Sequence, residues 1–571
     1  MQLFKKTNNN TYGWKKAYYL ITFLVPLVYV LINFGRICGP FFPPDEFGYW
    51  NNVGRWLGLD WSGASFNQSF YAYGYSLLLY PFARFLNDPL SMYRGALIMN
   101  ALLFFAQAAV LYSLVDELTW DDKDTDKKLS APFMFAVCLS GAFYPAHFVY
   151  MNYTICESLL YVLLPLSFLF LVRYEKSRRP QYAVLAVAVS VMLVFTHFRT
   201  IGVFITMIVA VIIVARRNKG ERFEFRRLIS VGVILAVAAA GVVALSLTHF
   251  KTGFRYIDDQ LVRLSSIISV HGILSFMMGI AGKFLYVIIA SLGLLFLYLR
   301  WVKHNRKSIS QMAFAASLII SIIISAMFFV NTTWTDCLVY GRYTEIFLPV
   351  VVCLGMVELN YGGLSFDHAV KNSFITALIS AVVLFYAITN SVNIYMRDFI
   401  IGMTWMFGNK TPAINMLFAV PTIVCAVFIW LYYGLGRMQN RMVLKSFAPI
   451  LVLMIFAYAG ITMSEKCSYR LHDVDRSDLT MFEEVSEEYD KGRSILFIRC
   501  PWTNYVGHLQ FFMFDRPMTY LEGDLEGGNG EAPPTAPDDM VITYPNYEHA
   551  DQLKERYAHV EKTAHFVMYS N

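Results

Sequence analysis

Residues 17–50 read AYYLITFLVPLVYVLINFGRICGPFFPPDEFGYW, an apolar run that ends in a proline-flanked acidic pair, Asp45-Glu46. An apolar run of about 20 residues spans a bilayer as a helix. Lysines precede this run, and no small-residue cleavage site follows it. We therefore expect a retained signal anchor, with the acidic pair just beyond the membrane.

The rest of the chain has the composition of a membrane protein. Of its 571 residues, 57% are hydrophobic and only 15% are charged, whereas about a quarter of a soluble domain is charged. This composition excludes a soluble multidomain enzyme, a disordered protein and a fibrous protein. Long apolar windows predict an α-helical polytopic protein with about thirteen spans, at 17–37, 92–115, 131–149, 157–172, 181–198, 200–215, 228–248, 279–299, 309–331, 343–359, 373–394, 413–433 and 446–463.

The positive charges predict the orientation. Basic clusters at 173–179, 216–227 and 300–307 all fall on one side of the predicted spans, the side of the N-terminus, which we expect to be cytoplasmic. An odd number of spans then places the C-terminal part outside. Residues 464–571 hold 10 basic and 20 acidic side chains, a net charge of −10, whereas the preceding residues hold 37 and 21, a net of +16. We expect a multi-pass plasma-membrane protein that contacts lipids and no nucleic acid.

Two domains are expected. The first, 1–463, is the transmembrane domain, and its first outer loop, about 36–91, is apolar and tyrosine-rich, which favours short helices along the outer leaflet. The second, 464–571, is a small extracytoplasmic α/β domain, because the runs SILFIRC, LQFFMF, DMVITY and HFVMYS are typical of strands and DLTMFEEVSEEYDK is typical of a helix. A disulfide between Cys467 and Cys500 is chemically allowed there and stays open.

The acidic pair is the first candidate for chemistry. Pro43 and Pro44 stiffen the backbone before it, and the following FGYW can begin a helix whose N-terminal dipole favours an ionised carboxylate. A carboxylate at the membrane surface can act as a general base toward an incoming hydroxyl. We expect Asp45 and Glu46 to be catalytic. The alternative is a solvated pair in a loop.

A second set of candidates lies at span ends on the same expected face. Glu157 is an ionisable group at membrane depth, which is a candidate for substrate binding. The alternatives are a carboxylate that snorkels to the outer interface and an ion pair with a neighbouring arginine. Arg199 and Arg342 suit the phosphate of a donor, with His197 and Tyr343 beside them in FTHFRT and YGRYTEIFLP. An interfacial anchor or a salt bridge is the alternative for each arginine.

Tyr71, Tyr73 and Tyr75 alternate in SFYAYGYS and are candidates for contact with a sugar or lipid. An interfacial aromatic belt is the alternative explanation of this pattern. The eight cysteines show no CxxC and no metal-ligand spacing. Whether a divalent metal serves as cofactor therefore stays open.

The architecture as a whole resembles the GT-C glycosyltransferases, in particular the protein mannosyltransferase and aminoarabinose transferase group. PDEFGYW looks like the acidic first-loop motif of that group, and YAYGYSLLLYP looks like the later part of the same loop. YMNYTICESLL is placed like the segment that opens the fourth span, although this chain has Glu157 in place of an aspartate. GRYTEIFLP is similar to a late segment of bacterial members.

The resemblance implies an inverting transfer of a sugar from a polyprenyl-phosphate carrier to a lipid, glycan or protein acceptor on the outer face. Asp45 would be the general base, and Arg199 and Arg342 would hold the phosphate. Two other functions stay open. A transporter or flippase for lipid-linked saccharides predicts internal repeats and charges at mid-span. A polysaccharide polymerase or ligase normally has its chemistry in a large late outer loop.

Overall fold

The structure is a computed structural model, and it describes residues 9–40, 45–64, 72–86, 88–119, 129–217, 265–330, 335–390, 399–408, 410–437, 442–499, 505–522, 535–536 and 539–571. The chain forms two compact units. We call the first the membrane unit; it comprises Met1–Val28, Asn100–Met151 and Cys156–Ser464. The second is the sheet unit, which comprises Tyr29–Met99, Asn152–Ile155 and Glu465–Asn571.

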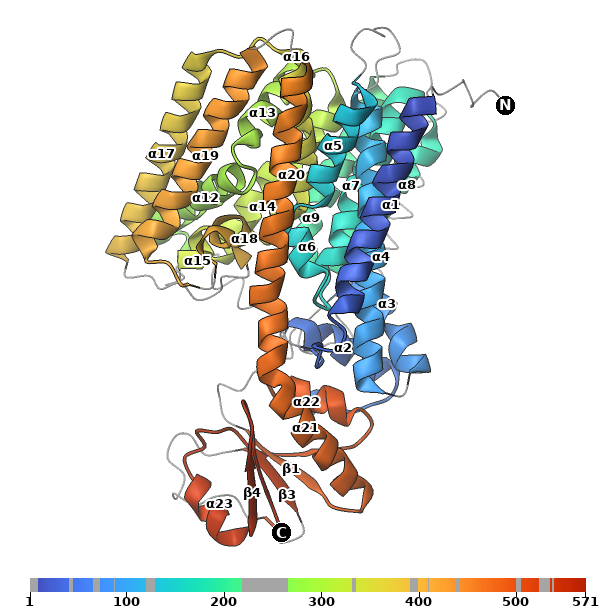
Figure 1. Ribbon diagram of the computed structural model, residues 1–571, viewed down its shortest axis with the longest axis vertical. Coiled ribbons are helices and arrows are strands. Elements are labelled where there is room, and N and C mark those ends of the chain that lie inside the picture. Colours follow the sequence, from blue (N-terminus) through green and yellow to red (C-terminus); the bar gives the residue numbers. More distant parts are fainter. Residues whose placement is uncertain are drawn as a thin grey trace. The chain divides into compact units, whose positions relative to one another are not determined.

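Long apolar helices dominate the membrane unit (Figure 1). Within the described ranges, nine helices are long and apolar enough to cross a membrane. They comprise α1 (Asn9–Ile32), α4 (Pro89–Thr119), α7 (Glu157–Ser177), α9 (Ile201–Arg216) with the 3₁₀ turn η3 (Phe198–Thr200), α12 (Val270–Ala290), α14 (Ile309–Phe328), α17 (Phe366–Thr389), α19 (Ile414–Arg437) and α20 (Met442–Ser464), which continues into the next unit. Helices α17 and α19 run side by side in Figure 1.

Shorter elements connect these helices. They are α5 (Ala131–Ala142), α6 (Pro145–Tyr150), α8 (Pro180–Thr196), α13 (Leu294–His304), α15 (Thr335–Leu338), η4 (Glu345–Phe347), α16 (Leu348–Tyr361), α18 (Ile401–Thr404) and η6 (Trp405–Phe407).

The predicted count of thirteen spans is not confirmed. The apolar run 131–149 is broken into two short helices because Pro145 lacks the amide hydrogen that a continuous helix needs. The run 279–299 is likewise divided between α12 and α13, where Gly293 adopts a left-handed conformation with φ of 80°. The predicted span 228–248 lies outside the described residues. The polytopic helical fold itself is confirmed.

The sheet unit joins a helical loop to an α/β segment. Its helices and strands are α2 (Asp45–Trp56), η1 (Ser62–Ala64), α3 (Tyr73–Phe85), the π-helical turn η7 (Glu465–Tyr469), α21 (Arg470–Asp490), β1 (Ile495–Arg499), α22 (Val506–Met513), β2 (Thr519–Glu522), β3 (Met540–Thr543), α23 (Ala550–Arg556), β4 (His559–Lys562) and β5 (Val567–Ser570). The sheet has the order β2-β1-β3-β5-β4, with β1 parallel to both neighbours and β5 antiparallel to both of its own.

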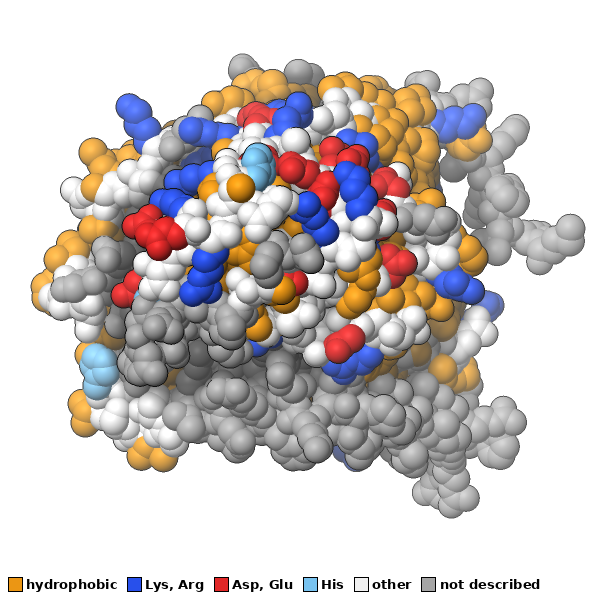
Figure 2. Space-filling model, turned by 90° about the horizontal axis from the view of Figure 1, so that it is seen from below, with side chains coloured by type: hydrophobic (Ala, Val, Ile, Leu, Met, Phe, Trp, Pro, Cys, Tyr) orange, Lys and Arg blue, Asp and Glu red, His pale blue; other side chains and the backbone are white. Residues whose placement is uncertain are grey.

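The strand pattern confirms the predicted α/β character and corrects one element. SILFIRC, DMVITY and HFVMYS contain β1, β3 and β5, as predicted, and their apolar residues form a core with α23. LQFFMF is wrong as a strand, because it lies mostly in α22. Every residue of α22 is buried, so helical packing on all sides outweighs the strand preference of its phenylalanines. Figure 2 shows basic and acidic side chains interspersed over one face of the molecule.

Candidate active site

The acidic pair begins a helix, as predicted. Asp45 and Glu46 are the first two residues of α2, so their carboxylates lie at the positive end of the helix dipole. The two side chains differ in exposure: Asp45 is half-buried, whereas Glu46 is completely buried. Only the first of the two is therefore open to a substrate.

Glu46 is held by three hydrogen bonds to one oxygen. Its Oε2 accepts from the Tyr93 hydroxyl at 2.8 Å and from both the amide and the hydroxyl of Thr154, each at 2.6 Å. The indole Nε1 of Trp50 donates to the Thr154 hydroxyl at 3.0 Å. These bonds pin the start of α2 to the segment Asn152–Ile155. Glu46 thus acts as a positioning residue for the helix start that carries Asp45.

The described tyrosines of the first loop have different environments. Tyr75 is fully buried and packs edge-to-face on Tyr49, with ring centroids 5.5 Å apart. Tyr73 is partly exposed beside Trp56, and burial raises the pKa of its hydroxyl to about 12, so it stays a neutral hydrogen-bond donor. Tyr71 lies outside the described residues. Contact with substrate stays a prediction for all three, and packing accounts for Tyr75.

Five other predicted residues meet in the membrane unit. Glu157, the first residue of α7, is contacted at its carboxylate by the guanidiniums of Arg199 and Arg342. Arg199 Nη2 lies 2.7 Å from Oε1, and Arg342 holds both oxygens, with Nη2 3.0 Å from Oε2 and Nε bonded to Oε1. None of the three side chains is more than 6% exposed. We call these three residues the arginine cluster.

Aromatic rings complete the surroundings of the arginine cluster. The Arg199 guanidinium lies 4.9 Å from the ring centroid of Tyr343, and that of Arg342 lies 5.0 Å from Phe399. His197 accepts the backbone N–H of Arg199 at Nδ1, at 3.2 Å, and so caps the turn η3. His197 therefore shapes the turn that presents Arg199.

The arginine cluster has an excess of positive charge. Its two guanidiniums are always protonated, and Glu157 supplies a single negative charge, so the three residues carry a formal charge of +1. The Nε of Arg199 is buried and has no hydrogen-bond partner among the described residues. An unbalanced buried charge is costly. An anion with several acceptor oxygens, such as a phosphate, would offset that cost.

One carboxylate near the cluster was missed by the sequence interpretation. Glu345 follows Arg342 by three residues and is fully buried. Its carboxylate accepts hydrogen bonds from the hydroxyl of Tyr150, at 2.6 Å, and from the hydroxyl of Tyr286. The available signal was an ionisable residue at the start of an apolar helix, in the same YGRYTEIFLP motif as the arginine.

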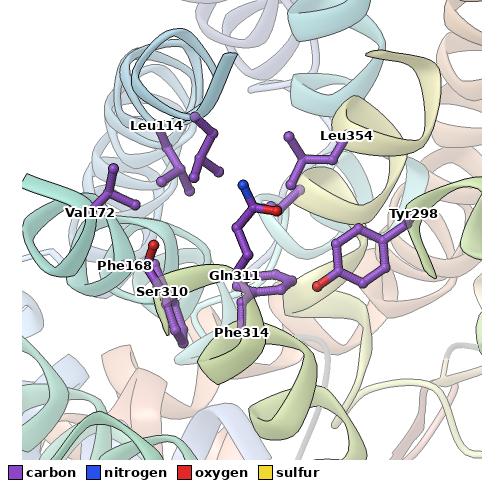
Figure 3. A pocket seen from close by; sticks show the side chains of 10 residues that line it. Leu114, Phe168, Val172, Tyr298, Ser310, Gln311, Phe314 and Leu354 are labelled. Carbon is purple, nitrogen blue, oxygen red and sulfur yellow. The ribbon is translucent and has the colours of Figure 1, made fainter. Parts of the chain in front are cut away.

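A pocket elsewhere in the membrane unit does not suit a phosphate. It is lined mainly by apolar side chains, including Leu114, Phe168 and Leu354 (Figure 3). The amide of Gln311 points among them, and its Oε1 is buried without a hydrogen-bond partner in the described structure. No arginine or lysine lines this pocket, so the arginine cluster is the better anion site.

Comparison with known proteins identifies the fold. The sequence matches no family model and no curated protein. The structure is similar to that of ArnT from Cupriavidus metallidurans bound to undecaprenyl phosphate, with a TM-score of 0.54 and 12% sequence identity over 98% of both chains. It is also similar to arabinosyltransferase EmbB from Mycobacterium smegmatis, with a TM-score of 0.42 and 15% identity over 79% of this chain and 41% of EmbB. The resemblance to the GT-C glycosyltransferases is thus confirmed at the level of the fold.

Proposed function

We propose that this chain of GT-C fold is an integral membrane glycosyltransferase that moves a sugar from a polyprenyl-phosphate carrier to an acceptor on the outer face of the membrane. The observation that carries the proposal is the arginine cluster, with its buried excess of positive charge. The ArnT structure with the same fold holds undecaprenyl phosphate, which is a polyprenyl phosphate. The positive charge of the arginine cluster therefore suits the phosphate group of a polyprenyl-phosphate donor.

The arginine cluster is the proposed site of the donor phosphate. Glu157 fixes the two guanidiniums, because each of its oxygens is engaged by at least one of them. A guanidinium presents several N–H donors in one plane and matches phosphate oxygens in pairs. The cluster would therefore hold the phosphate of the donor and stabilise the charge that the phosphate gains when the sugar leaves.

Asp45 is the proposed general base. Its carboxylate lies at the positive end of the α2 dipole, and buried Glu46 keeps the start of that helix in place. The carboxylate takes the proton of an acceptor hydroxyl, and the oxygen attacks the anomeric carbon. The bond from that carbon to the phosphate oxygen breaks, and polyprenyl phosphate leaves with the electron pair. Attack opposite the leaving group inverts the anomeric centre.

The outward orientation is part of the proposal. The basic clusters 173–179 and 300–307 fall on the side expected to be cytoplasmic, which places the C-terminal α/β segment outside. A lipid-linked donor keeps its tail in the bilayer, so membrane lipids surround the reaction. The acceptor is a lipid, a glycan or a protein with a free hydroxyl.

Asp45→Asn tests the proposal in purified protein supplied with a polyprenyl-phosphate sugar. Asn keeps the size of the side chain and cannot accept a proton. Because general-base catalysis contributes roughly 10²–10⁴-fold, the single-turnover rate should fall by about that factor while donor affinity stays constant. Asp60→Asn is the matched control, since Asp60 is an exposed carboxylate of the same loop. Full sugar transfer by the Asp45→Asn variant would refute the role of Asp45 as general base. Transport of a lipid-linked saccharide by the wild type, without any sugar transfer, would favour a transporter.

A further inference from the structure

A second polar cluster lies in the α/β segment of the sheet unit. Asp475 and Asp478 stand three residues apart on α21, so both face the same side of the helix. The turn between β4 and β5 brings His565 against them. Its Nδ1 lies 2.6 Å from Asp478 Oδ2 and 3.4 Å from Asp475 Oδ1. One ligand atom from each of the three residues lies within 4.8 Å of the other two.

The backbone and a tyrosine hold this cluster in place. The His565 amide donates to Asp478 Oδ1 at 3.1 Å, and the Ala564 amide donates to Ser477 Oγ at 3.1 Å. The ring of Tyr505 stacks on the His565 imidazole, with centroids 3.8 Å apart. The imidazole is thus oriented toward α21 by the backbone hydrogen bonds to that helix and by the stacked ring of Tyr505. Such prior orientation is what a ligand set needs.

One carboxylate oxygen of this cluster has no hydrogen-bond partner among the described residues. Asp475 is only 2% exposed, and its Oδ2 has no hydrogen-bond partner within the described residues. Buried carboxylate oxygens are normally satisfied. With both carboxylates ionised and the imidazole protonated, the cluster carries a net charge of −1. With a neutral imidazole, a divalent cation would bring the net charge to zero and occupy the unsatisfied oxygen.

We propose that Asp475, Asp478 and His565 bind a divalent transition-metal ion of the zinc or manganese class. One imidazole nitrogen and two carboxylate oxygens suit these ions better than calcium or magnesium, which favour all-oxygen sites. On binding, the protonated imidazolium of His565 releases its Nδ1 proton to solvent and keeps the proton on Nε2, so the Nδ1 lone pair of the neutral imidazole coordinates the metal. Metal–ligand distances of about 2.0–2.2 Å in a tetrahedral site hold the ligand atoms roughly 3.3–3.6 Å apart, so the 2.6 Å contact between His565 Nδ1 and Asp478 Oδ2 must widen to admit the ion.

The bound ion would fasten two parts of one fold. Asp475 and Asp478 belong to the helix that precedes the sheet, whereas His565 belongs to the hairpin of the last two strands. The ion would therefore tie the end of the chain to α21 and stabilise the α/β segment. This role does not depend on the proposed glycosyl transfer.

Metal content and thermal unfolding of the full-length protein in detergent test this site. The protein is stripped with EDTA, transferred to chelator-free buffer and supplied separately with ZnCl₂, MnCl₂, MgCl₂ or CaCl₂. We expect about one zinc or manganese ion per chain by elemental mass spectrometry, with a higher melting temperature. Magnesium and calcium should neither be retained by the protein nor raise its melting temperature. Absence of retained zinc and manganese would overturn the proposal.

Three variants locate the ion. Asp475→Asn and His565→Ala should each weaken metal binding at least about tenfold. Asp475→Asn should also melt no lower than the wild type without metal, because it removes an unsatisfied buried charge. His559→Ala is the matched control, since His559 belongs to a more exposed group with Glu484 and Glu561. Loss of metal in the control, or its retention in both cluster variants, would place the ion elsewhere and overturn the assignment.

Discussion

The membrane unit and the sheet unit each hold an arginine–carboxylate cluster, and the two have opposite compositions. In the membrane unit, the single carboxylate of Glu157 faces two guanidiniums and is fully buried. In the sheet unit, the single guanidinium of Arg36 faces Glu465, at 2.7 Å, and Asp473, at 2.6 Å. Side chains of this second cluster are 30–53% exposed.

The difference in exposure decides what each surplus charge means. The surplus negative charge around Arg36 is solvated, so it needs no further partner and contributes little free energy. The surplus positive charge of the three residues in the arginine cluster is shielded from water, so it is costly unless a further anion offsets it. The same side-chain chemistry thus serves the fold in one unit and, in our proposal, a ligand in the other. Four measurements test this contrast.

Glu157→Gln should have the largest effect. It leaves two buried guanidiniums without a counter-charge, and breaking a buried pair in this way costs about 3–5 kcal/mol. We expect a strongly lowered melting temperature in detergent and little donor binding. Glu358→Gln is the matched control, because buried Glu358 pairs with Arg300 and His304, which are 23% and 51% exposed and reach water. If both variants lower the melting temperature equally, the greater burial of the arginine cluster makes no difference to stability.

Arg199→Ala should separate binding from folding. Arg342 still neutralises Glu157 in this variant, so the melting temperature should stay close to that of the wild type. Loss of hydrogen bonds to a charged phosphate costs about 1.5–3 kcal/mol, which corresponds to roughly 10–150-fold weaker donor use. Arg199→Lys should restore part of this loss, because it keeps the charge without the planar fork.

Arg300→Ala is the control for an arginine–glutamate pair of the same unit outside the arginine cluster. Its donor use should match the wild type. If Arg199→Ala instead unfolds, or if both alanine variants lose donor use equally, the arginine cluster has a structural role and no specific one in phosphate binding.

Much of the fold was predictable because membrane spans are local signals. Apolar runs, their basic ends and the acidic motif that begins with Asp45 can be recognised from neighbouring residues alone, and the start of α2 was predicted in this way. The α/β character of the C-terminal segment followed from short apolar runs. The count of thirteen spans is not confirmed, and two of the predicted long runs are interrupted at Pro145 and Gly293.

The contacts of the candidate site were less predictable because they join distant residues. Glu46 is held by Thr154, 108 positions further along the chain, and Glu157 is held by Arg342 across 185 positions. The sequence indicated which residues are unusual and left the pairing of Glu157 open. No local pattern specifies that Tyr150 and Tyr286 share Glu345 or that LQFFMF packs as a helix.

Arg36→Ala should cost less free energy than Glu157→Gln costs in folding or Arg199→Ala costs in donor binding. It removes the four hydrogen bonds of one guanidinium to Glu465 and Asp473, yet water can solvate the two carboxylates that remain. An exposed pair contributes about 0.2–1 kcal/mol. We expect a slightly lower melting temperature and unchanged transfer. A loss of stability as large as that of Glu157→Gln would contradict the exposed character of this cluster.

Salt should reveal the smallest difference between the two clusters. Raising the concentration of NaCl from 0.1 to 1 M shortens the Debye length from about 10 to about 3 Å, and this screens exposed charges far more than buried ones. The difference in melting temperature between the wild type and Arg36→Ala should therefore disappear in 1 M NaCl. The difference between the wild type and Arg199→Ala in donor affinity should persist, because Arg199 is only 2% exposed. Comparing each variant with the wild type at the same salt cancels the general effect of salt on apolar burial. If both differences disappear together, water and ions reach the arginine cluster, and its surplus charge no longer requires a bound phosphate.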